Sequence, residues 1–543
     1  MGLALSAEQK DLLKIFKIEE QYIIPAFQRP YSWGYDQCYQ LYTDLIKAFE
    51  SNEDYFIGNI IISKSDNDKD ELEIIDGQQR MITILLLFKV LHSFQPELKV
   101  LKQILKQEDW EGVEGKTRIR SEIFEENDGD YIDDIIEYST NKLNERLEEC
   151  LDKSNKINER KTKHKLELNA LYFLFWLKYY ENKNKNVKEF ISFLLKRVYL
   201  LPIELTGKTK EEANSKALVI FETINNRGMN LEDADIFKAK LYQRAKNVNE
   251  ERIFIDSWVD LKNSCNKLGV TIDDVFRYYS HIIRGKEGIT SSEINLREFF
   301  TRTTYSPLEQ KKYKDILDEL FKIVEILEFI DEERVSRSEA STWIQLIDIY
   351  TNQYPKYAII TYLYCNELKV DEKFITFLTS LVRYVYHQGS TTTVKFEIYN
   401  MIKQLSAGVA IGSYEKDIDT SFFDNTGRLK FGFSLLAFYL GSKVSLPAYS
   451  IDRVITYRDM EGLSSDWNNV NKDLIVDQIG NLVVLDIPKK NLLLAKKKEY
   501  YLKSDLNEIK MIFSNEFTYE FFKERDKELK NRLVRFFKNS IYE

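Results

Sequence analysis

The chain has 543 residues and a formal net charge of −9, with 43% hydrophobic and 30% charged residues. This balance excludes a disordered chain, and the negative charge excludes a protein that coats DNA through its overall charge. Any contact with nucleic acid therefore requires a local basic patch.

The chain contains few helix breakers, with 8 Pro and 20 Gly, which predicts a mainly helical fold. Cys38, Cys150, Cys265 and Cys365 are scattered singly, which argues against a zinc site or a disulfide framework. The sequence shows no signal-peptide pattern and no apolar run of about 20 residues. We therefore expect a cytoplasmic protein without a membrane partner.

Strand and helix signals alternate over about the first 95 residues, which predicts a small α/β unit. The predicted elements are a helix over Ser6–Phe16, a strand over Tyr22–Pro25, a helix over Asp36–Phe49, strands over Tyr55–Ser63 and Leu72–Ile75, and a helix over Gln78–Phe94.

The rest of the chain is predominantly helical. The charged stretch Asn141–Glu167 predicts a solvated helix or linker, and Val198–Leu205 predicts a strand in which Pro202 marks an edge or a bulge. Amphipathic helices follow over about 250–410. A loop-rich break over Ala407–Thr426 then leads to a final segment of mixed helix and strand.

The first candidate site is Asp76-Gly77-Gln78-Gln79-Arg80, between a predicted strand and a predicted helix. Such a junction offers free backbone N–H groups and the positive end of a helix dipole, which suit a phosphate. Arg80 can bind phosphate through two nitrogens, and Asp76 can hold a metal ion or orient a water. An ordinary Asp-Gly turn that caps the helix explains these residues equally simply.

Two further polar segments accompany this junction. The loop Ile24–Trp33 contains Gln28, Arg29 as a second phosphate ligand and Tyr31 as a stacking face for a base. Its alternative is a rigid turn with inward aromatics. The segment Phe221–Leu231 carries Glu222, Asn225 and Arg227 at the end of a helix, and its alternative is a simple C-cap at Gly228.

Together the motifs resemble the GmrSD-type restriction endonucleases. The family's ordered motifs correspond here to Ile24–Trp33, Tyr55–Ile60, Ile75–Arg80 and Phe221–Gly228, within about residues 10–245. The family's Leu-Thr-Thr after the arginine is Met81-Ile82-Thr83 here, a mild departure. The resemblance implies a ParB-like (sulfiredoxin-like) N-terminal fold that binds and hydrolyses nucleoside triphosphates.

The resemblance also implies roles for individual residues. The catalytic cluster would be Asp76, Gln78, Gln79 and Arg80, acting with Mg²⁺ or Mn²⁺. The nucleotide-binding residues would be Gln28, Arg29, Tyr31, Gly77, Glu222, Asn225 and Arg227.

Members of this family usually carry a C-terminal HNH-like nuclease domain, and the frame of that motif is recognisable here. Its remnants would be Asp452, Arg453, Asn481, Asn491 and Lys498. The position of the catalytic histidine is Arg453, and the last histidine of the chain is His387. Because an arginine cannot act as a base near neutral pH, we expect no cleavage by the HNH route.

A basic stretch in the same segment could follow a nucleic-acid backbone, or could be an ordinary solvated helix face. It contains Lys489, Lys490, Lys496, Lys497, Lys498 and Lys503, together with Tyr500 and Tyr501.

We therefore expect a mainly α protein with a small α/β N-terminal ParB/sulfiredoxin-like domain (1–245), a helical middle domain (246–410) and a small, degenerate HNH-like α+β C-terminal domain (411–543). The favoured function is a nucleoside triphosphatase that acts on or senses foreign DNA in anti-phage restriction. The alternative is a non-cleaving nucleotide- or DNA-sensing subunit that supports a separate nuclease or assembles with further copies of itself.

Overall fold

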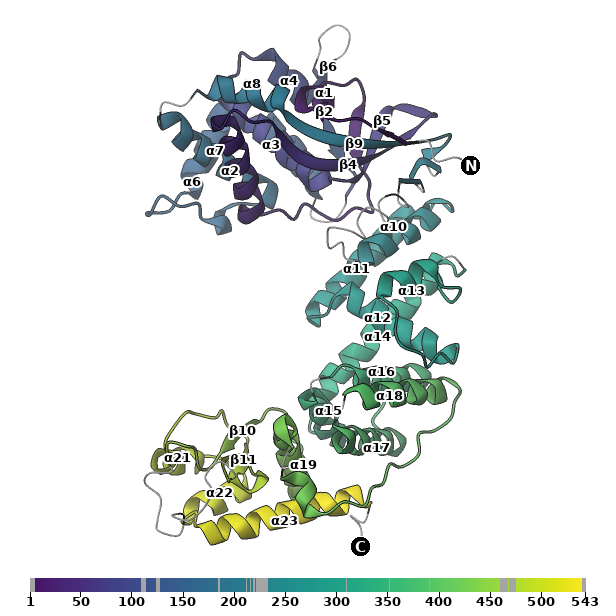
Figure 1. Cartoon of the computed structure of the whole chain (residues 1–543), viewed down its shortest axis with the longest axis vertical. Coiled ribbons are helices and arrows are strands. Elements are labelled where there is room, and N and C mark those ends of the chain that lie inside the picture. Colours follow the sequence, from purple (N-terminus) through teal and green to yellow (C-terminus); the bar gives the residue numbers. More distant parts are fainter. Residues whose placement is uncertain are drawn as a thin grey trace. The chain divides into compact units, whose positions relative to one another are not determined.

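The computed structural model describes residues 5–108, 114–123, 127–183, 186–210, 212–214, 216–217, 220, 233–308, 310–350, 352–389, 391–424, 426–459, 467 and 475–539. As predicted, the described chain is mainly helical with a small mixed sheet near the N-terminus (Figure 1). It divides into two compact units, Met1–Val259 and Asp260–Glu543. The division into 1–245, 246–410 and 411–543 stays a prediction.

One mixed sheet, seven-stranded within the described residues, forms the centre of the N-terminal unit, in the order β1-β9-β4-β5-β3-β8 with β2 also paired to β9. Figure 1 shows its two longest strands, β4 and β9, side by side and parallel. The strands are β1 (Leu5–Ala7), β2 (Lys10–Asp11), β3 (Gln21–Ile24), β4 (Tyr55–Ser65), β5 (Asp68–Asp76), β8 (Ile119–Ser121) and β9 (Val198–Gly207). A separate hairpin pairs β6 (Lys106–Glu108) with β7 (Glu114–Thr117).

The strand directions bring three loops to one edge of this sheet. Strands β3, β5 and β8 are mutually parallel, so their carboxyl ends at Ile24, Asp76 and Ser121 lie at the same edge. Strand β4 runs antiparallel to β5, and Ile61 pairs with Asp76. The first residues of β4 therefore extend past the end of β5.

Helix α3 is the central helix of this unit. Nearly every residue from Met81 to Leu91 is buried, because α3 contacts α4, α5, α7 and α8 as well as lying on the sheet. The helices are α1 (Leu12–Phe16), α2 (Tyr35–Glu50), α3 (Gln78–Phe94), α4 (Lys99–Leu105), α5 (Asp128–Glu137), α6 (Thr140–Cys150), α7 (Lys165–Asn182), α8 (Val187–Arg197) and α10 (Asp233–Lys246). Helix α11 (Glu251–Lys267) begins in this unit and ends in the second.

The second unit begins with a run of packed helices and ends in a small α+β segment. The helices of the run are α12 (Ile272–Lys286), α13 (Leu296–Arg302), α14 (Tyr313–Arg334), α15 (Glu339–Ile349), α16 (Tyr354–Cys365), α17 (Glu372–Gln388) and α18 (Thr391–Ser406). The end segment contains α19 (Lys430–Ser442), β10 (Ser450–Arg453), β11 (Leu482–Leu485), α21 (Leu494–Tyr501), α22 (Asn507–Ser514) and α23 (Tyr519–Phe537), with β10 antiparallel to β11.

The described residues contain no helix long and apolar enough to span a membrane. All four cysteines are free thiols, and Cys38, Cys150 and Cys265 are buried.

Candidate functional site

The junction between β5 and α3 is built around a glycine. Gly77 has φ +94°, a left-handed conformation that favours glycine. A Cβ on Gly77 would lie 2.6 Å from the Ile60 Cγ2 atom, so β4 also leaves no room for a side chain. Gly77 is the N-cap residue of α3 and offers no side-chain cap. The first backbone N–H groups of this long helix are therefore left for another acceptor.

Asp76 and Arg80 lie at this junction as an ion pair. The Arg80 Nη2 atom is 3.4 Å from the Asp76 Oδ2 atom, and the two side chains are 15% and 22% exposed. Arg80 lies against the backbone of Gly58, where an added Cβ would collide with its Nη1 atom. A partly exposed guanidinium and a partly exposed carboxylate thus flank the uncapped start of α3.

Burial raises the pKa of Asp76 above its ordinary value, although Arg80, the backbone N–H of Gly77 and Arg29 each act to lower it. The cost of removing the carboxylate from water is therefore larger than the combined attraction of its partners. Titrating groups with such perturbed pKa values are common at functional sites.

The loop Pro25–Trp33 is fastened to this junction by glutamine side chains. The Gln28 amide donates to the Ile75 carbonyl at 2.8 Å, and the Gln78 amide donates to the Arg29 carbonyl at 2.9 Å. Gln79 accepts from the Ser32 backbone N–H at 2.8 Å and donates to the Pro30 carbonyl. The predicted neighbours Gln28 and Arg29 therefore do lie beside Asp76–Arg80.

The side-chain amides of Gln78 and Gln79 differ in whether all their polar atoms are hydrogen-bonded within the protein. Both are buried, and the Gln79 amide is used at both ends by the loop, so Gln79 positions the loop and is not placed to touch a ligand. The Gln78 Oε1 atom, in contrast, has no hydrogen-bond partner among the described residues. A buried carbonyl oxygen without a donor is costly and suits a bound water or a ligand N–H or O–H group.

Tyr31 corrects one prediction. Its side chain is 1% exposed, and its hydroxyl is hydrogen-bonded to Thr83 at 2.6 Å and to Asn169 at 3.0 Å. The ring therefore belongs to the core and is not available to stack on a base. Tyr31 fixes the loop from within, as the alternative of inward-packed aromatics supposed.

Sequence reasoning missed a buried aspartate–histidine pair that supports this loop from beneath. Asp128 is fully buried and accepts a hydrogen bond from the Tyr31 backbone N–H at 2.6 Å. The His164 Nε2 atom lies 3.1 Å from the other oxygen of Asp128, and its ring stacks on Tyr131. No local motif could indicate this contact, because Asp128 and Tyr31 are 97 residues apart.

A cavity of about 590 Å³ opens at the same edge of the sheet. It is lined by residues that follow β3 and β8 and by α10 and α11, among them Ala26, Ser121, Glu122, Tyr242 and Glu251. Burial raises the pKa of Glu122, and nearby Arg120 acts against this shift. The cavity is of the size that accepts a small molecule. The predicted residues Glu222, Asn225 and Arg227, with the whole motif Phe221–Gly228, lie outside the described residues.

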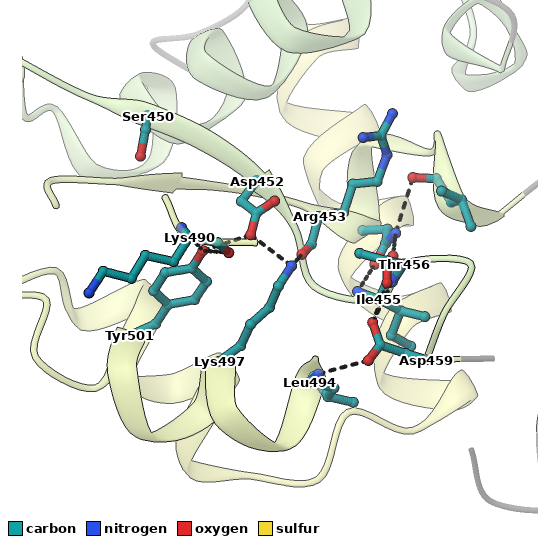
Figure 2. Close-up of polar contacts among 12 residues, drawn as sticks. Ser450, Asp452, Arg453, Ile455, Thr456, Asp459, Lys490, Leu494, Lys497 and Tyr501 are labelled. Carbon is teal, nitrogen blue, oxygen red and sulfur yellow. Dashed lines mark hydrogen bonds and ion pairs between the residues drawn. The ribbon is translucent and has the colours of Figure 1, made fainter. Parts of the chain in front are cut away.

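The predicted HNH-like segment of the second unit contains a buried lysine (Figure 2). The Lys497 side chain is 1% exposed, and its ammonium lies 2.7 Å from the Asp452 Oδ2 atom and donates to the Arg453 carbonyl. The Tyr501 hydroxyl donates to the same Asp452 oxygen at 2.7 Å. Lys497 and Tyr501 are thus internal, which corrects their inclusion in a basic surface.

The other HNH-like candidates do not gather around Asp452. Asn481 is fully buried, and its amide bonds to the Ile455 backbone at both ends, so it holds a turn together. The Arg453 guanidinium pairs with Asp477 at 2.8 Å. Asn491 and Lys498 are exposed, and neither makes a side-chain contact with Asp452 in the described part of the unit. The described residues hold no group of three or more His, Cys, Asp or Glu side chains able to bind a metal ion.

Comparison with known proteins identifies one family. Residues 11–242 match the model of the GmrSD restriction endonuclease N-terminal domain. This match confirms the resemblance inferred from the four motifs and covers the sheet strands from β3 to β9, α3 and the Asp76–Arg80 junction. No curated protein matches the chain.

Proposed function

Because residues 11–242 belong to the family of GmrSD restriction endonuclease N-terminal domains, which ties this chain to restriction-type phage defence, we propose that its N-terminal unit hydrolyses a nucleoside triphosphate at Asp76–Arg80. The hydrolysis would couple to action on, or sensing of, foreign DNA. One observation carries this proposal: a raised-pKa carboxylate and a guanidinium flank the uncapped N-terminus of α3.

Each group at the junction has a chemical task in this proposal. The free N–H groups at the start of α3 would bind phosphate oxygens, as helix N-termini do. Arg80 and Arg29 would stabilise the negative charge that develops as the terminal phosphate leaves. Asp76, with its raised pKa, would accept a proton from the attacking water. The neighbouring cavity beside Glu122 offers room for the rest of the nucleotide.

Mg²⁺ or Mn²⁺ fits this donor set as a companion of the nucleotide. The junction supplies one carboxylate, Asp76, and Mg²⁺ commonly binds through one or two carboxylates together with substrate phosphates. Asp76 would hold the ion through one of the ion's water molecules, which leaves the carboxylate free to accept a proton, and the ion would neutralise charge on the phosphate oxygens. The residues of the chain would then orient the phosphates and the water.

Turnover of the four nucleoside triphosphates, with Mg²⁺ and with or without DNA, tests the proposal. We expect Asp76→Asn and Arg80→Ala each to lower kcat by about 100-fold or more. Asp66→Asn is the matched control, since Asp66 is an exposed aspartate at the opposite end of the same hairpin. Equal turnover by the wild type and Asp76→Asn would contradict the proposed catalytic site.

For the second unit we propose that no DNA is cut by the HNH route. The observation that supports this is the ammonium of Lys497, which already neutralises Asp452, beside an arginine at the histidine position. The chain would then depend on a separate nuclease subunit or on assembly with further copies.

A plasmid-nicking assay with Mg²⁺ or Mn²⁺ tests this second proposal. We expect the supercoiled plasmid to stay intact. Arg453→Ala and Asn491→Ala are the informative variants, because both side chains reach solvent and their loss should not unfold the unit. Nicking by the wild type that either variant abolishes would show that an HNH-type centre operates after all.

A further inference from the structure

Three lysines lie around the Tyr500 ring of α21: Lys496 within the helix, Lys490 before it and Lys503 after it. The Lys490 ammonium is 4.3 Å and the Lys503 ammonium 5.8 Å from the centre of the Tyr500 ring. Lys496 precedes Tyr500 by one helical turn and so shares its flank. The opposite flank is turned inward, since Lys497 and Tyr501 are buried. We call Lys490, Lys496, Tyr500 and Lys503 the lysine–tyrosine surface.

These three lysines are exposed and form no ion pair with any described residue. Some exposed cations of the unit pair with carboxylates, as Lys369 does with Glu367 and Lys538 with Asp417, but isolated lysines such as Lys373 and Lys510 form no ion pair among the described residues. The lysine–tyrosine surface differs from these in gathering three such lysines around one ring. Figure 2 shows the Lys490 side chain running away from the carboxylate of Asp452. In a chain with a net charge of −9, this surface is therefore a local excess of positive charge.

Like charges gathered on one surface repel one another, and Glu499 is the only acidic residue among the four lysines of Leu494–Lys503. An anion that spans several of these cations would be attracted by all of them. Because the Tyr500 ring is covered by Lys490 and Lys503, the surface offers charge and not a free aromatic face. Contacts to a repeating phosphate backbone match these features better than base stacking does.

We propose that Lys490, Lys496 and Lys503 bind the phosphodiester backbone of duplex DNA without reading its sequence. The inference rests on the proposed restriction function for the choice of DNA as the partner. The surface itself lies outside the matched residues 11–242 and is inferred from the geometry of this chain. An anionic membrane is the less suitable partner, because α21 is only 8 residues long and offers little apolar area to insert.

Fluorescence anisotropy with a labelled DNA duplex, in the absence of nucleotide, tests this inference on the full chain. Three proteins are compared with the wild type: Lys490→Ala/Lys496→Ala/Lys503→Ala, the same three positions changed to Arg, and the control Lys267→Ala/Lys373→Ala/Lys510→Ala. The control removes equal charge from three exposed lysines dispersed over the same unit. Thermal unfolding verifies that each protein is folded.

We expect the alanine variant of the surface to weaken binding about tenfold or more, and to reduce the slope of log Kd against log salt by about 2–3, as three lost phosphate contacts require. The arginine variant should bind like the wild type, and the dispersed control should change Kd less than about twofold. Parallel titrations use duplex RNA and phosphatidylserine vesicles.

Three results would overturn the inference: no binding by the wild type, an equal loss in the control, or a loss confined to RNA or vesicles. Nucleotide turnover is measured on the same proteins. If the alanine variant loses DNA binding and keeps the turnover of the wild type, the proposed surface is supported. If the wild type turns over nucleotide but does not bind DNA, the surface is refuted and the proposed N-terminal site is not. If the wild type binds DNA without turnover and the alanine variant loses that binding, the surface is supported and the proposed triphosphatase activity is refuted.

Discussion

At the scale of single residues, the raised pKa of Asp76 has a consequence for the free energy of unfolding. Burial raises its pKa despite two neighbouring arginines, so ionising it costs the folded protein free energy. A group whose folded pKa lies above its unfolded value contributes stability below the unfolded pKa, and that contribution is lost as the pH rises through the folded pKa. At neutral pH the Asp76 carboxylate is therefore a net burden on the fold.

We predict that Asp76→Asn stabilises the protein at about pH 7, and that the gain disappears below about pH 4, where the native carboxyl is protonated in both states. Urea midpoints of the two proteins at both pH values measure this. A variant less stable than the wild type at pH 7 would mean that the ion pair with Arg80 outweighs the burial. The same raised pKa predicts that nucleotide turnover declines with falling pH earlier than an ordinary aspartate would allow.

Among the secondary structure elements, helix α3 acts as the frame of the site. Its first turn provides Gln78 and Gln79, which hold the backbone of the loop Pro25–Trp33, and its interior provides Thr83, which holds Tyr31. The loop brings Arg29 to the junction. The position of Arg29 therefore depends on glutamines that need not touch any ligand.

We predict that Gln79→Ala destabilises the protein by about 1–3 kcal/mol, because it leaves buried loop groups without partners. Nucleotide turnover should also fall, mainly through a lower kcat, since Arg29 loses the position from which it would stabilise charge in the transition state. Chemical unfolding and steady-state kinetics measure the two effects, with the exposed Gln40→Ala of α2 as the control. Unchanged turnover in a destabilised variant would show that the reaction does not depend on the loop that Gln79 holds.

Most elements of the N-terminal unit follow from the sequence, and their long-range contacts do not. The predicted helix Gln78–Phe94 has the bounds that α3 shows, because a glycine at positive φ starts it and an apolar run sustains it. The predicted helix Ser6–Phe16 is wrong over its first half, where β1 and β2 precede α1.

Pro202 corrects the predicted sheet edge, because β9 lies between β1 and β4. The proline falls between the residues of β9 that pair with β1 and those that pair with β2. The sequence left two alternatives for Tyr31, a stacking face or an inward-packed ring, because a motif lists residues without showing which face the core covers.

At the scale of the whole molecule, the two compact units keep distinct chemistry. The N-terminal unit contains the matched family domain and the proposed nucleotide site, and the second unit contains the lysine–tyrosine surface and the Lys497 cluster. Family motifs indicated the first site, and the HNH-like assignment of the second unit stays a prediction. The buried Lys497 lies in a polar stretch whose inward and outward sides the sequence alone does not separate, whereas the buried Asn481 directly precedes the apolar strand β11.

We predict that Lys497→Met destabilises the second unit by about 3 kcal/mol, because it leaves the Asp452 carboxylate without its buried partner. Adding Asp452→Asn to that variant should restore much of the loss, since the unpaired charge is then gone. Unfolding followed by tryptophan fluorescence measures this double-mutant cycle. Additive losses in the double variant would show that the pair is not coupled.

Because Lys497 is buried, its reactivity towards a chemical label indicates whether the C-terminal segment is folded. An amine-reactive reagent should modify Lys496 and Lys498 quickly and leave Lys497 between them untouched, because the Lys497 side chain is 1% exposed and its ammonium is held by an ion pair. Mass spectrometry of the peptide that contains these three neighbours would then distinguish intact from opened protein. The rate at which Lys497 becomes labelled would therefore measure how fast the C-terminal segment unfolds, without a reporter group introduced by mutation.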